Sequence, residues 1–482
     1  MKKQLLGRTA VFAAAVAALM FVAPGCSRRA DRPDPEAPTV ITLWHAYNAF
    51  AKAEFDRCVD RFNDTVGKEK GIIVDAYGFG SSAELDEALY DSANQIIGAE
   101  PLPDLFTAYP GSARRLDGIA PLMNLEDYFD GEELEKYRPE FLAEGMWEED
   151  GSPRMLPIAK STELLFLNST EYDRFSRETG ADPAKLGTWE GLKETAEGYW
   201  KWSGGKPFLG MNGYNDFAIL SAVQLGCEPF RSEGGKVVFD YPRDVARQVW
   251  ELYYVPHLMG WYRSATYNQD GVKSGKLAAY IGSSAGAGYF PEEVIVNEGE
   301  RYPVECRVLT YPTFEGKKDY MTQRGANLCA FSSDPVHEYA SAEFMKWFTE
   351  PAQNVTFAAT TGYLPVEKEA LSSLPELLAH PKQDDNGVAV EKSVAAALGA
   401  MESREFYVKR CFKGAYEADR VFGESLGDKV SEDLEALEVR VHAGGDRETL
   451  VAAYIGEENF ESWYQGLLAQ MDQILNGEKD EE

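Results

Sequence analysis

From residue 40 onward, short apolar runs alternate with amphipathic segments along the chain. Three of the apolar runs are rich in β-branched or aromatic residues and have the length of buried strands. They are residues 40–44 (VITLW), 72–76 (IIVDA) and 103–109 (PDLFTAY). Apolar residues at helical spacing around Phe55 follow the first run, and a capping-box pair, Ser81 with Glu84, begins a helix after the second. This order of strands and helices predicts an α/β domain with a parallel sheet.

The alternation breaks at residues 155–168 (MLPIAKSTELLFLN), an extended run that contains Pro157, and then resumes. Further elements are predicted as a helix around Trp189, strands at 276–282 and 307–312, a helix that begins at Asp334 and Pro335, and a final helix over 460–474. More than 400 residues follow position 39, which exceeds what a single core normally supports. Two α/β domains are therefore expected.

The N-terminus has the pattern of an export signal. Basic residues precede an apolar run over residues 9–22, which is shorter than the roughly 20 residues that a membrane span requires. We therefore expect a secretory signal peptide at residues 1–25. The sequence APGC that ends at Cys26 resembles a bacterial lipobox, which predicts a lipid on Cys26. Residues 26–38 contain no apolar run and are expected to form a tether, and residues 477–482 an acidic tail.

Charge and cysteine content narrow the possible functions. The formal net charge of -31 argues against nucleic acid as a partner, because phosphates would be repelled. The chain has no CxxC pair and only five His, so no metal site and no cofactor are expected. Spacing leaves the disulfide pairing open; Cys306 with Cys329 is the first pair to test. The cysteines available besides Cys26 are Cys58, Cys227, Cys306, Cys329 and Cys411.

Several segments, taken in order, resemble the family of extracellular solute-binding proteins of bacterial ABC importers, and most closely its glycerol-3-phosphate-binding branch. The matching segments are ITLWHAYNAF at Ile41, LPIAKSTELLFLNSTEY at Leu156, TWEGL at Thr188, GKLAAYIGSSAG at Gly275, RGANL at Arg324 and TGYLPV at Thr361. The resemblance implies a two-lobed periplasmic-binding-protein fold (type II-like), with the solute held in the cleft between the lobes. One lobe would contain residues 38–160 and 310–350, and the other 161–309 and 351–476.

The resemblance also implies ligand-binding residues. The motif positions of the branch's serines, glycine, tyrosine, arginine and tryptophan fall on Ser161, Ser283, Gly325, Tyr363, Arg404 and Trp189. The branch also binds its ligand with a tyrosine and a glutamate of the first lobe, and this sequence has neither residue at the corresponding positions. One position falls in the loop that ends at Ser82, and the other is occupied by Tyr109. Because the serine, glycine and tyrosine positions of the second lobe match, the resemblance favours glycerol-3-phosphate or a related glycerophosphodiester as the solute. The departure in the first lobe keeps a neutral di- or oligosaccharide as the alternative, and Trp44, Tyr109 and Trp189 could stack on its rings.

Each of these residues also has a purely structural interpretation. Trp189 could be a core residue, Tyr363 could pack between Gly362 and Pro365, and the GSSAG sequence around Ser284 could be only a tight turn. GSSAG also fits the nucleophile elbow of α/β-hydrolases. A secreted hydrolase that uses Ser284 is therefore the alternative function, with a histidine downstream of it. The candidates are His337, His380 and His442.

The resemblance predicts a non-enzymatic lipoprotein that captures a small polyhydroxylated solute and delivers it to the permease subunits of an ABC transporter. We expect a monomer outside the cytoplasm that contacts the membrane only through its lipid anchor. The envelope type, and with it the membrane that holds the lipid, stays open, as do the identity of the solute and the permease partner.

Overall fold

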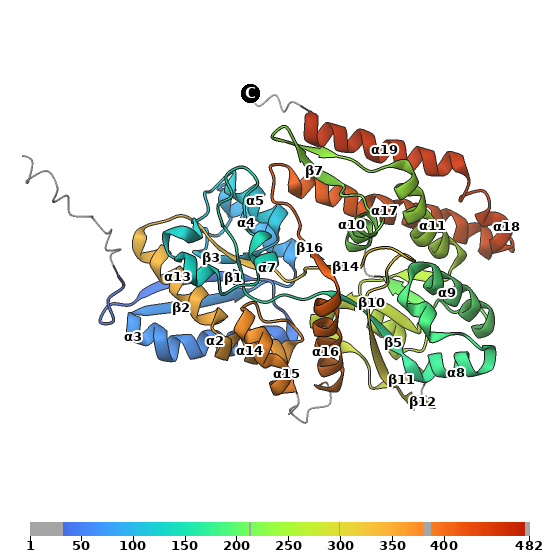
Figure 1. Cartoon of the computed structure of the whole chain (residues 1–482), viewed down its shortest axis with the longest axis horizontal. Helices are drawn as coiled ribbons and strands as arrows, with labels where there is room; N and C mark the ends of the chain where they lie inside the picture. Colours follow the sequence, from blue (N-terminus) through green and yellow to red (C-terminus); the bar gives the residue numbers. More distant parts are fainter. Residues whose placement is uncertain (1–31, 212–213, 298, 379–386, 478–482) are drawn as a thin grey trace, which may run out of the picture.

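The computed structural model of the chain describes residues 32–211, 214–297, 299–378 and 387–477. The expected signal peptide, Cys26 and most of the acidic tail lie outside the described residues. Two lobes are visible side by side, each built around its own five-stranded sheet (Figure 1). This arrangement confirms the predicted α/β class and the predicted two-lobed architecture.

The first lobe contains a mixed sheet with the strand order β2-β1-β3-β15-β4. Its strands are β1 (Thr39–His45), β2 (Ile72–Gly78), β3 (Leu105–Ala108), β4 (Leu156–Pro157) and β15 (Asn327–Ala330). The first three strands are parallel, as their sequence pattern predicts, and β15 is antiparallel to both of its neighbours. The carboxyl ends of β1, β2 and β3 therefore lie at one edge, where ligands bind in α/β proteins.

Local sequence signals explain where several helices of the first lobe begin. The Ser81 hydroxyl accepts a hydrogen bond from the Glu84 amide at 3.2 Å, although the Glu84 carboxylate accepts from Gly80 instead of completing the capping box. Asp334 caps the later helix by accepting from the amides of Val336 and His337. The helices are α2 (Ala49–Phe62), η1 (Asn63–Gly67), α3 (Lys68–Lys70), α4 (Ser82–Ala93), α5 (Pro110–Asp117), η2 (Leu125–Asp127), α6 (Gly131–Leu134), α7 (Pro139–Ala143) and α13 (Pro335–Thr349).

The second lobe has the strand order β13-β5-β10-β6-β9. Its strands are β5 (Glu163–Asn168), β6 (Leu209–Met211), β9 (Tyr262–Ser264), β10 (Ala279–Ser283) and β13 (Cys306–Thr310). Strands β6, β9 and β10 are parallel, and β5 is antiparallel to β10 and β13. All six residues of β5 are buried, which fits a central strand covered on both faces.

Helices and two hairpins surround the second sheet, and the C-terminal helices α17 and α19 pack alongside α11 (Figure 1). The helices are α8 (Ser169–Thr179), η3 (Pro183–Gly187), α9 (Trp189–Ser203), α10 (Asn215–Gln224), α11 (Arg243–Met259), α12 (Asn268–Lys273), η4 (Ser284–Tyr289), α16 (Gly387–Ser403), α17 (Ala415–His442), α18 (Arg447–Val451) and α19 (Glu457–Asn476). The hairpins are β7 (Phe230–Glu233) with β8 (Lys236–Phe239) and β11 (Glu293–Asn297) with β12 (Glu300–Pro303).

Two helices after residue 350 lie at the junction of the lobes. They are α14 (Pro351–Thr361) and α15 (Lys368–Leu378). Phe357 of α14 is fully buried in the core of the first lobe, where its ring contacts Phe55 and Phe348. The resemblance suggested that this part of the first lobe ends at residue 350. The packing of Phe357 extends the first lobe beyond that residue.

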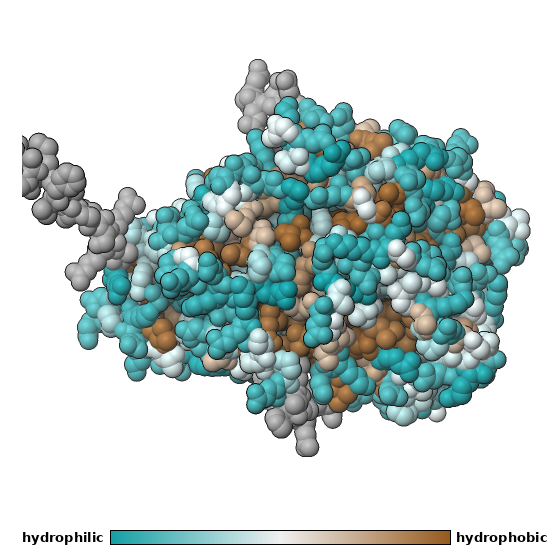
Figure 2. Space-filling view, in the orientation of Figure 1, coloured by the Kyte–Doolittle hydropathy of each residue, from teal (hydrophilic) through white to brown (hydrophobic). Residues whose placement is uncertain are grey.

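The surface agrees with the acidic, polar composition. The face seen in Figure 2 is mainly hydrophilic, with hydrophobic residues visible toward the middle, between the lobes. Within the described ranges, no helix is both long and apolar enough to cross a bilayer. The described part of the expected tether, residues 32–38, contacts the first lobe through Asp34, which lies against Gly71, and Arg32, which lies over the Tyr339 ring.

The proposed Cys306–Cys329 disulfide is wrong. Cys306 lies on β13 in the second lobe and Cys329 on β15 in the first, and all five cysteines of the described chain are free. Burial raises the pKa of Cys58 to about 11. It raises the pKa of Cys329 by more than that of Cys58. Apolar packing keeps these side chains protonated, so they behave as small core residues.

We expect a Cys26→Ser variant to show five reactive thiols with Ellman's reagent in guanidinium chloride. Cys58, Cys329 and Cys411 should be unreactive in the folded protein, because they are buried and the thiolate is the reactive form. Ser232→Cys, at an exposed position, serves as the positive control for native reactivity. Three reactive thiols after unfolding would instead indicate a disulfide.

Candidate functional site

Three chain segments cross between the lobes side by side. The amides of Ser161 and Arg324 each donate to the carbonyl of the other at 2.8 Å, and the Lys160 amide donates to the Leu364 carbonyl at 2.9 Å. A fourth crossing contains β16 (Glu405–Tyr407), which pairs in parallel with β14 (Tyr320–Thr322), the strand just before Arg324. These crossings form the floor of the interlobe cleft and bring residues from distant parts of the sequence together.

A cluster of charged side chains lies directly above this floor. The Arg324 guanidinium donates to the Glu163 carboxylate, and its Nε lies 3.4 Å from an Asp216 carboxylate oxygen. The Lys409 ammonium lies 3.8 Å from the other Asp216 oxygen. Burial raises the pKa of Glu163, and Arg324 opposes the rise while Asp216 adds to it. Two cations and two carboxylates thus neutralise one another in this cluster.

A cavity of about 140 Å³ opens beside the cluster on the side of the second lobe. Its wall is formed by Glu163, Met211, Asn215, Asp216, Phe217, Ile281, Tyr311 and Arg324. Within the described structure, the Tyr311 hydroxyl and the Asn215 side-chain oxygen have no hydrogen-bond partner although both are buried. Buried polar atoms are normally satisfied, so these two are available to a polar ligand. Drug-sized ligands occupy pockets of roughly 300 Å³ or more, so this cavity fits only one end of a larger solute.

Four of the residues selected from the sequence lie on or next to the floor of the cleft. The Ser283 hydroxyl donates to the Ser161 hydroxyl at 3.0 Å, although the two residues are 122 positions apart. Gly325 has φ of 92°, and a Cβ there would lie 2.2 Å from the Ala159 carbonyl oxygen, so only glycine fits. The ring of Tyr363 contacts that of Tyr47 edge-on, with centroids 5.9 Å apart.

Tyr109, at the end of β3, also faces this region from the first lobe. Burial raises the pKa of its hydroxyl, Arg324 opposes the rise, and Asp216 adds to it. Burial raises the pKa of Tyr363 as well, and Tyr109 adds to that rise. The backbone places both residues beside the cluster, because Tyr109 follows Ala108, which pairs with Asn327, and Tyr363 precedes Leu364, which bonds to Lys160.

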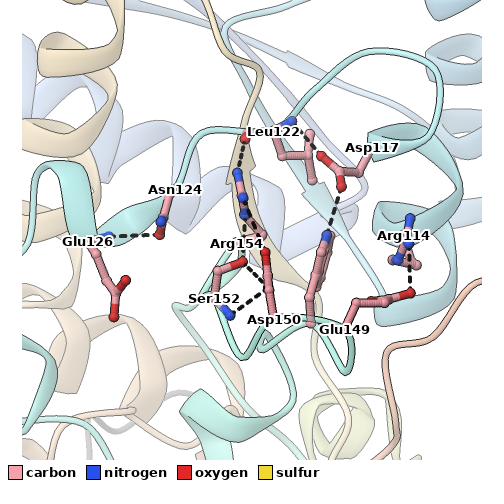
Figure 3. A network of polar contacts seen from close by, with 10 residues as sticks. Arg114, Asp117, Leu122, Asn124, Glu126, Glu149, Asp150, Ser152 and Arg154 are labelled. Carbon is pink, nitrogen blue, oxygen red and sulfur yellow. Dashed lines mark hydrogen bonds and ion pairs between the residues drawn. The ribbon is translucent and has the colours of Figure 1, made fainter. Parts of the chain in front are cut away.

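A polar network in the first lobe joins α5 to the loop before β4 (Figure 3). The Asp117 carboxylate accepts from the Leu122 amide at 2.8 Å and from the Trp147 indole at 2.7 Å. Arg154 donates to the Leu122 carbonyl at 2.7 Å. These bonds tie the loop before β4 to the end of α5, whose first turn follows Tyr109.

The other selected residues lie away from the cavity. Trp189 is fully buried and packs against Phe217 and Tyr311, behind the cavity wall, which favours its structural interpretation. Trp44 is 7% exposed, and its ring contacts Phe79 in the core of the first lobe. Neither tryptophan presents an exposed face for a sugar ring.

Arg404 is engaged in holding the end of β13. Its guanidinium donates to the Tyr311 carbonyl at 2.6 Å and to the Thr310 hydroxyl at 2.9 Å. Its Nε lies 3.8 Å from Asp319. Arg324 and not Arg404 is therefore the arginine that lines the cavity. Ser82 is the first residue of α4, at the carboxyl edge of the first sheet, and is partly exposed.

Sequence reasoning missed Glu163, Asp216, Tyr311 and Lys409 as site residues. Glu163 carried a signal, because a carboxylate at the head of the apolar strand ELLFLN must have a partner. Nothing in its surroundings distinguished Asp216 from the many other acidic residues.

The nucleophile elbow has no matching geometry in the described structure. The Ser284 side chain is fully buried, and its hydroxyl accepts from the Thr162 amide at 3.4 Å. His337 bonds to Asp334, and His442 bonds to the Glu438 carbonyl. His380 lies outside the described residues. The hydrolase alternative receives no support from this arrangement.

Comparisons with known proteins agree with the fold. A family profile described as "Bacterial extracellular solute-binding protein" matches residues 60–383. No match is found among curated proteins.

Solved structures that resemble the chain include the cyclic alpha-maltosyl-1,6-maltose binding protein of Arthrobacter globiformis, which has 15% identity and a TM-score of 0.63 over 91% of this chain and 100% of that one. UgpB of Mycobacterium tuberculosis in complex with glycerophosphocholine has 18% identity and the same TM-score, 0.63, over 91% and 99%. Lmo0181 of Listeria monocytogenes in complex with cycloalternan has 12% identity and a TM-score of 0.62 over 89% and 99%. At these identities the structures establish a shared fold and do not distinguish the glycerol-3-phosphate branch from the sugar binders. The profile covers more than half of the chain, and the protein belongs to the family of bacterial extracellular solute-binding proteins.

Proposed function

We propose that this protein binds a neutral carbohydrate in the cleft between its lobes and delivers it to the permease subunits of an ABC importer. Family membership and the match to two-lobed binding proteins support the transport role. A lipid on Cys26 would hold the protein at the envelope while the two lobes work in the surrounding water. Neither an enzymatic step nor a cofactor is part of this role.

A neutral solute is favoured mainly because the cations of the cleft are already paired with carboxylates. Arg324 lies between two carboxylates, those of Glu163 and Asp216, and Lys409 shares Asp216. Arg404, which the resemblance suggested for a phosphate, is engaged by β13. A phosphate would have to displace a carboxylate from Arg324, and two nearby negative charges would repel it.

The available groups suit sugar hydroxyls, which both donate and accept hydrogen bonds. Carboxylate oxygens of Glu163 and Asp216 can accept from them, and the Tyr311 hydroxyl has no partner in the described structure. Phe217 and Ile281 provide an apolar wall for the C–H face of a ring. Two of the structurally similar proteins are described with cyclic alpha-maltosyl-1,6-maltose and cycloalternan, which are carbohydrates.

Residues from both lobes surround the proposed site, since Tyr109 and Tyr363 come from the first lobe and Asp216 and Ser283 from the second. A solute that contacts residues of both lobes binds best when the lobes are closed around it. Binding therefore shifts the population toward the closed conformation. Small-angle scattering should then show a smaller radius of gyration with solute than without.

One observation favours a second candidate, a glycerophosphodiester with a cationic end. The Ser161–Ser283 hydroxyl pair matches the serine positions of the glycerol-3-phosphate branch. A cationic group could contact Asp216 and Glu163, and UgpB of Mycobacterium tuberculosis is described with glycerophosphocholine.

Calorimetry tests the two candidates against each other. The titrants are glucose, series of maltose-type, cellulose-type and xylose-type oligosaccharides, glycerol-3-phosphate and glycerophosphocholine. We expect heat from a neutral sugar and a 10- to 100-fold loss of its affinity in Asp216→Asn, since hydrogen bonds to charged groups contribute about 1.5–3 kcal/mol. Asp240→Asn is the matched control, because Asp240 forms an exposed ion pair with Arg231 at 2.9 Å. Heat from a phosphate compound alone would overturn the neutral-sugar proposal.

A further inference from the structure

Three aromatic side chains lie at the mouth of the cleft and belong to neither core. Tyr267 is 63% exposed and Tyr289 is 41% exposed, and both come from the second lobe. Phe50 comes from the first turn of α2 in the first lobe and is half-buried. Its ring centroid lies 5.4 Å from that of Tyr289, so the rings meet across the gap between the lobes.

The topology explains why these rings share one place. Tyr267 follows β9 and Tyr289 follows β10, and both strands run parallel to β6, so the two loops leave the same edge of the second sheet. Phe50 follows β1 and leaves the carboxyl edge of the first sheet. Ligands bind beyond these edges in open α/β sheets.

Tyrosines connect the mouth to the inner cavity. Burial raises the pKa of Tyr289, and Tyr267 adds to the rise. Burial likewise raises the pKa of Tyr363, with further contributions from Tyr109 and Tyr289. Tyr109 in turn is close enough to Arg324 to be affected by its charge. The chain geometry gives the same path, because Tyr289 ends η4 (Ser284–Tyr289), and Ser283, which directly precedes η4, donates to Ser161 beside Arg324.

The local backbone favours the position of Phe50. Ala49 has φ of 44°, a left-handed conformation that costs a non-glycine residue on the order of 1–3 kcal/mol and that tends to occur at functional sites. A Cβ at Gly288 would lie 3.0 Å from the Phe50 ring, so the absence of a side chain there lets the ring approach.

The inner cavity, about 140 Å³, is too small for more than one end of a solute. Exposed aromatic rings lose water-contacting apolar area when the C–H face of a sugar ring stacks on them. We propose that Phe50, Tyr267 and Tyr289 form an outer sugar subsite, so that the solute is a neutral oligosaccharide of at least two units that extends from the Arg324 cavity to the mouth. This inference rests on the proposed function and adds the solute's length and a second point of recognition.

Calorimetry with each oligosaccharide series, from one to five units, tests the subsite. We expect affinity to rise about tenfold or more from the monosaccharide to the trisaccharide in the series that binds. Tyr289→Ala and Tyr267→Ala should each lower trisaccharide affinity about tenfold and lower monosaccharide affinity less. Tyr289→Phe should retain trisaccharide binding, because stacking uses the ring and not the hydroxyl.

Tyr77→Ala serves as the control, because Tyr77 is 52% exposed and its hydroxyl bonds to Asp75 on β2. The Tyr77→Ala variant should bind every sugar with the same affinity as the unmodified protein. If the unmodified protein bound the monosaccharide and the trisaccharide with equal affinity, the outer subsite would be overturned. The same would follow if Tyr289→Ala lowered the affinity for both sugars equally. In either case the neutral-sugar proposal would stand. No heat from any sugar would overturn both.

Discussion

Glu144→Gln should destabilise the protein by about 3–5 kcal/mol, because it leaves the Lys160 ammonium without its carboxylate in a buried site. Lys160 is fully buried and Glu144 is 2% exposed. The Lys160 ammonium donates to Glu144 and, at 3.4 Å, to the Gly325 carbonyl, and Asn327 donates to the same Glu144 oxygen at 3.1 Å. Urea denaturation followed by circular dichroism measures the change in the free energy of unfolding.

A double-mutant comparison separates the cost of an unpaired charge from the value of the pair. Lys160→Met should also destabilise, and Glu144→Gln combined with Lys160→Met should be less destabilised than the two single effects added together. Glu424→Gln is the matched control, because its pair with Arg420 at 3.1 Å is exposed and should contribute less than about 1 kcal/mol. A change below 1 kcal/mol for Glu144→Gln would contradict the prediction.

Acidification should destabilise the protein through two buried histidines, His45 and His257. Burial lowers the pKa of each to about 4, and Lys52 adds to the effect at His45. The unfolded pKa is near 6.5, so between pH 6.5 and 4 the unfolded chain binds more protons than the folded one. The free energy of unfolding therefore falls as pH falls through this window, by on the order of 3 kcal/mol for each histidine.

Denaturation curves at several pH values from 7.5 to 4 measure this dependence. His257→Gln should reduce the slope between pH 6.5 and 4, because the His257 ring, which contacts the Tyr253 carbonyl at 2.7 Å, is then absent. His442→Gln, at an exposed position with 81% side-chain exposure, should leave the slope unchanged. Equal slopes in the unmodified protein and His257→Gln would show that His257 titrates normally in the fold.

Local sequence signals predicted most of the fold. The apolar runs at 40–44 and 72–76 became β1 and β2, and Asp334 caps α13 as expected. These predictions succeed because strand alternation, helical periodicity and capping depend on residues only a few positions apart. The extent of the first lobe was harder to predict, because the burial of Phe357 depends on Phe55 and Phe348, which lie elsewhere in the sequence.

The candidate site was predicted only in part. The resemblance selected Ser161 and Ser283, and their hydroxyls lie 3.0 Å apart in the structure. It also selected Arg404, whose guanidinium instead contacts β13. A motif position identifies a residue but does not say which of two arginines turns toward a cavity.

The sequence by itself determined the α/β class, the two-part organisation and the acidic surface, because each follows from composition or from patterns between near neighbours. Tertiary structure alone decided that Trp189 is buried behind the cavity, that the five cysteines within the described residues stay unpaired, and that Glu163, Asp216 and Arg324 neutralise one another. These properties depend on distances between residues far apart in the chain. Such distances are set by the packing of both lobes and the crossings between them, and no local pattern encodes them.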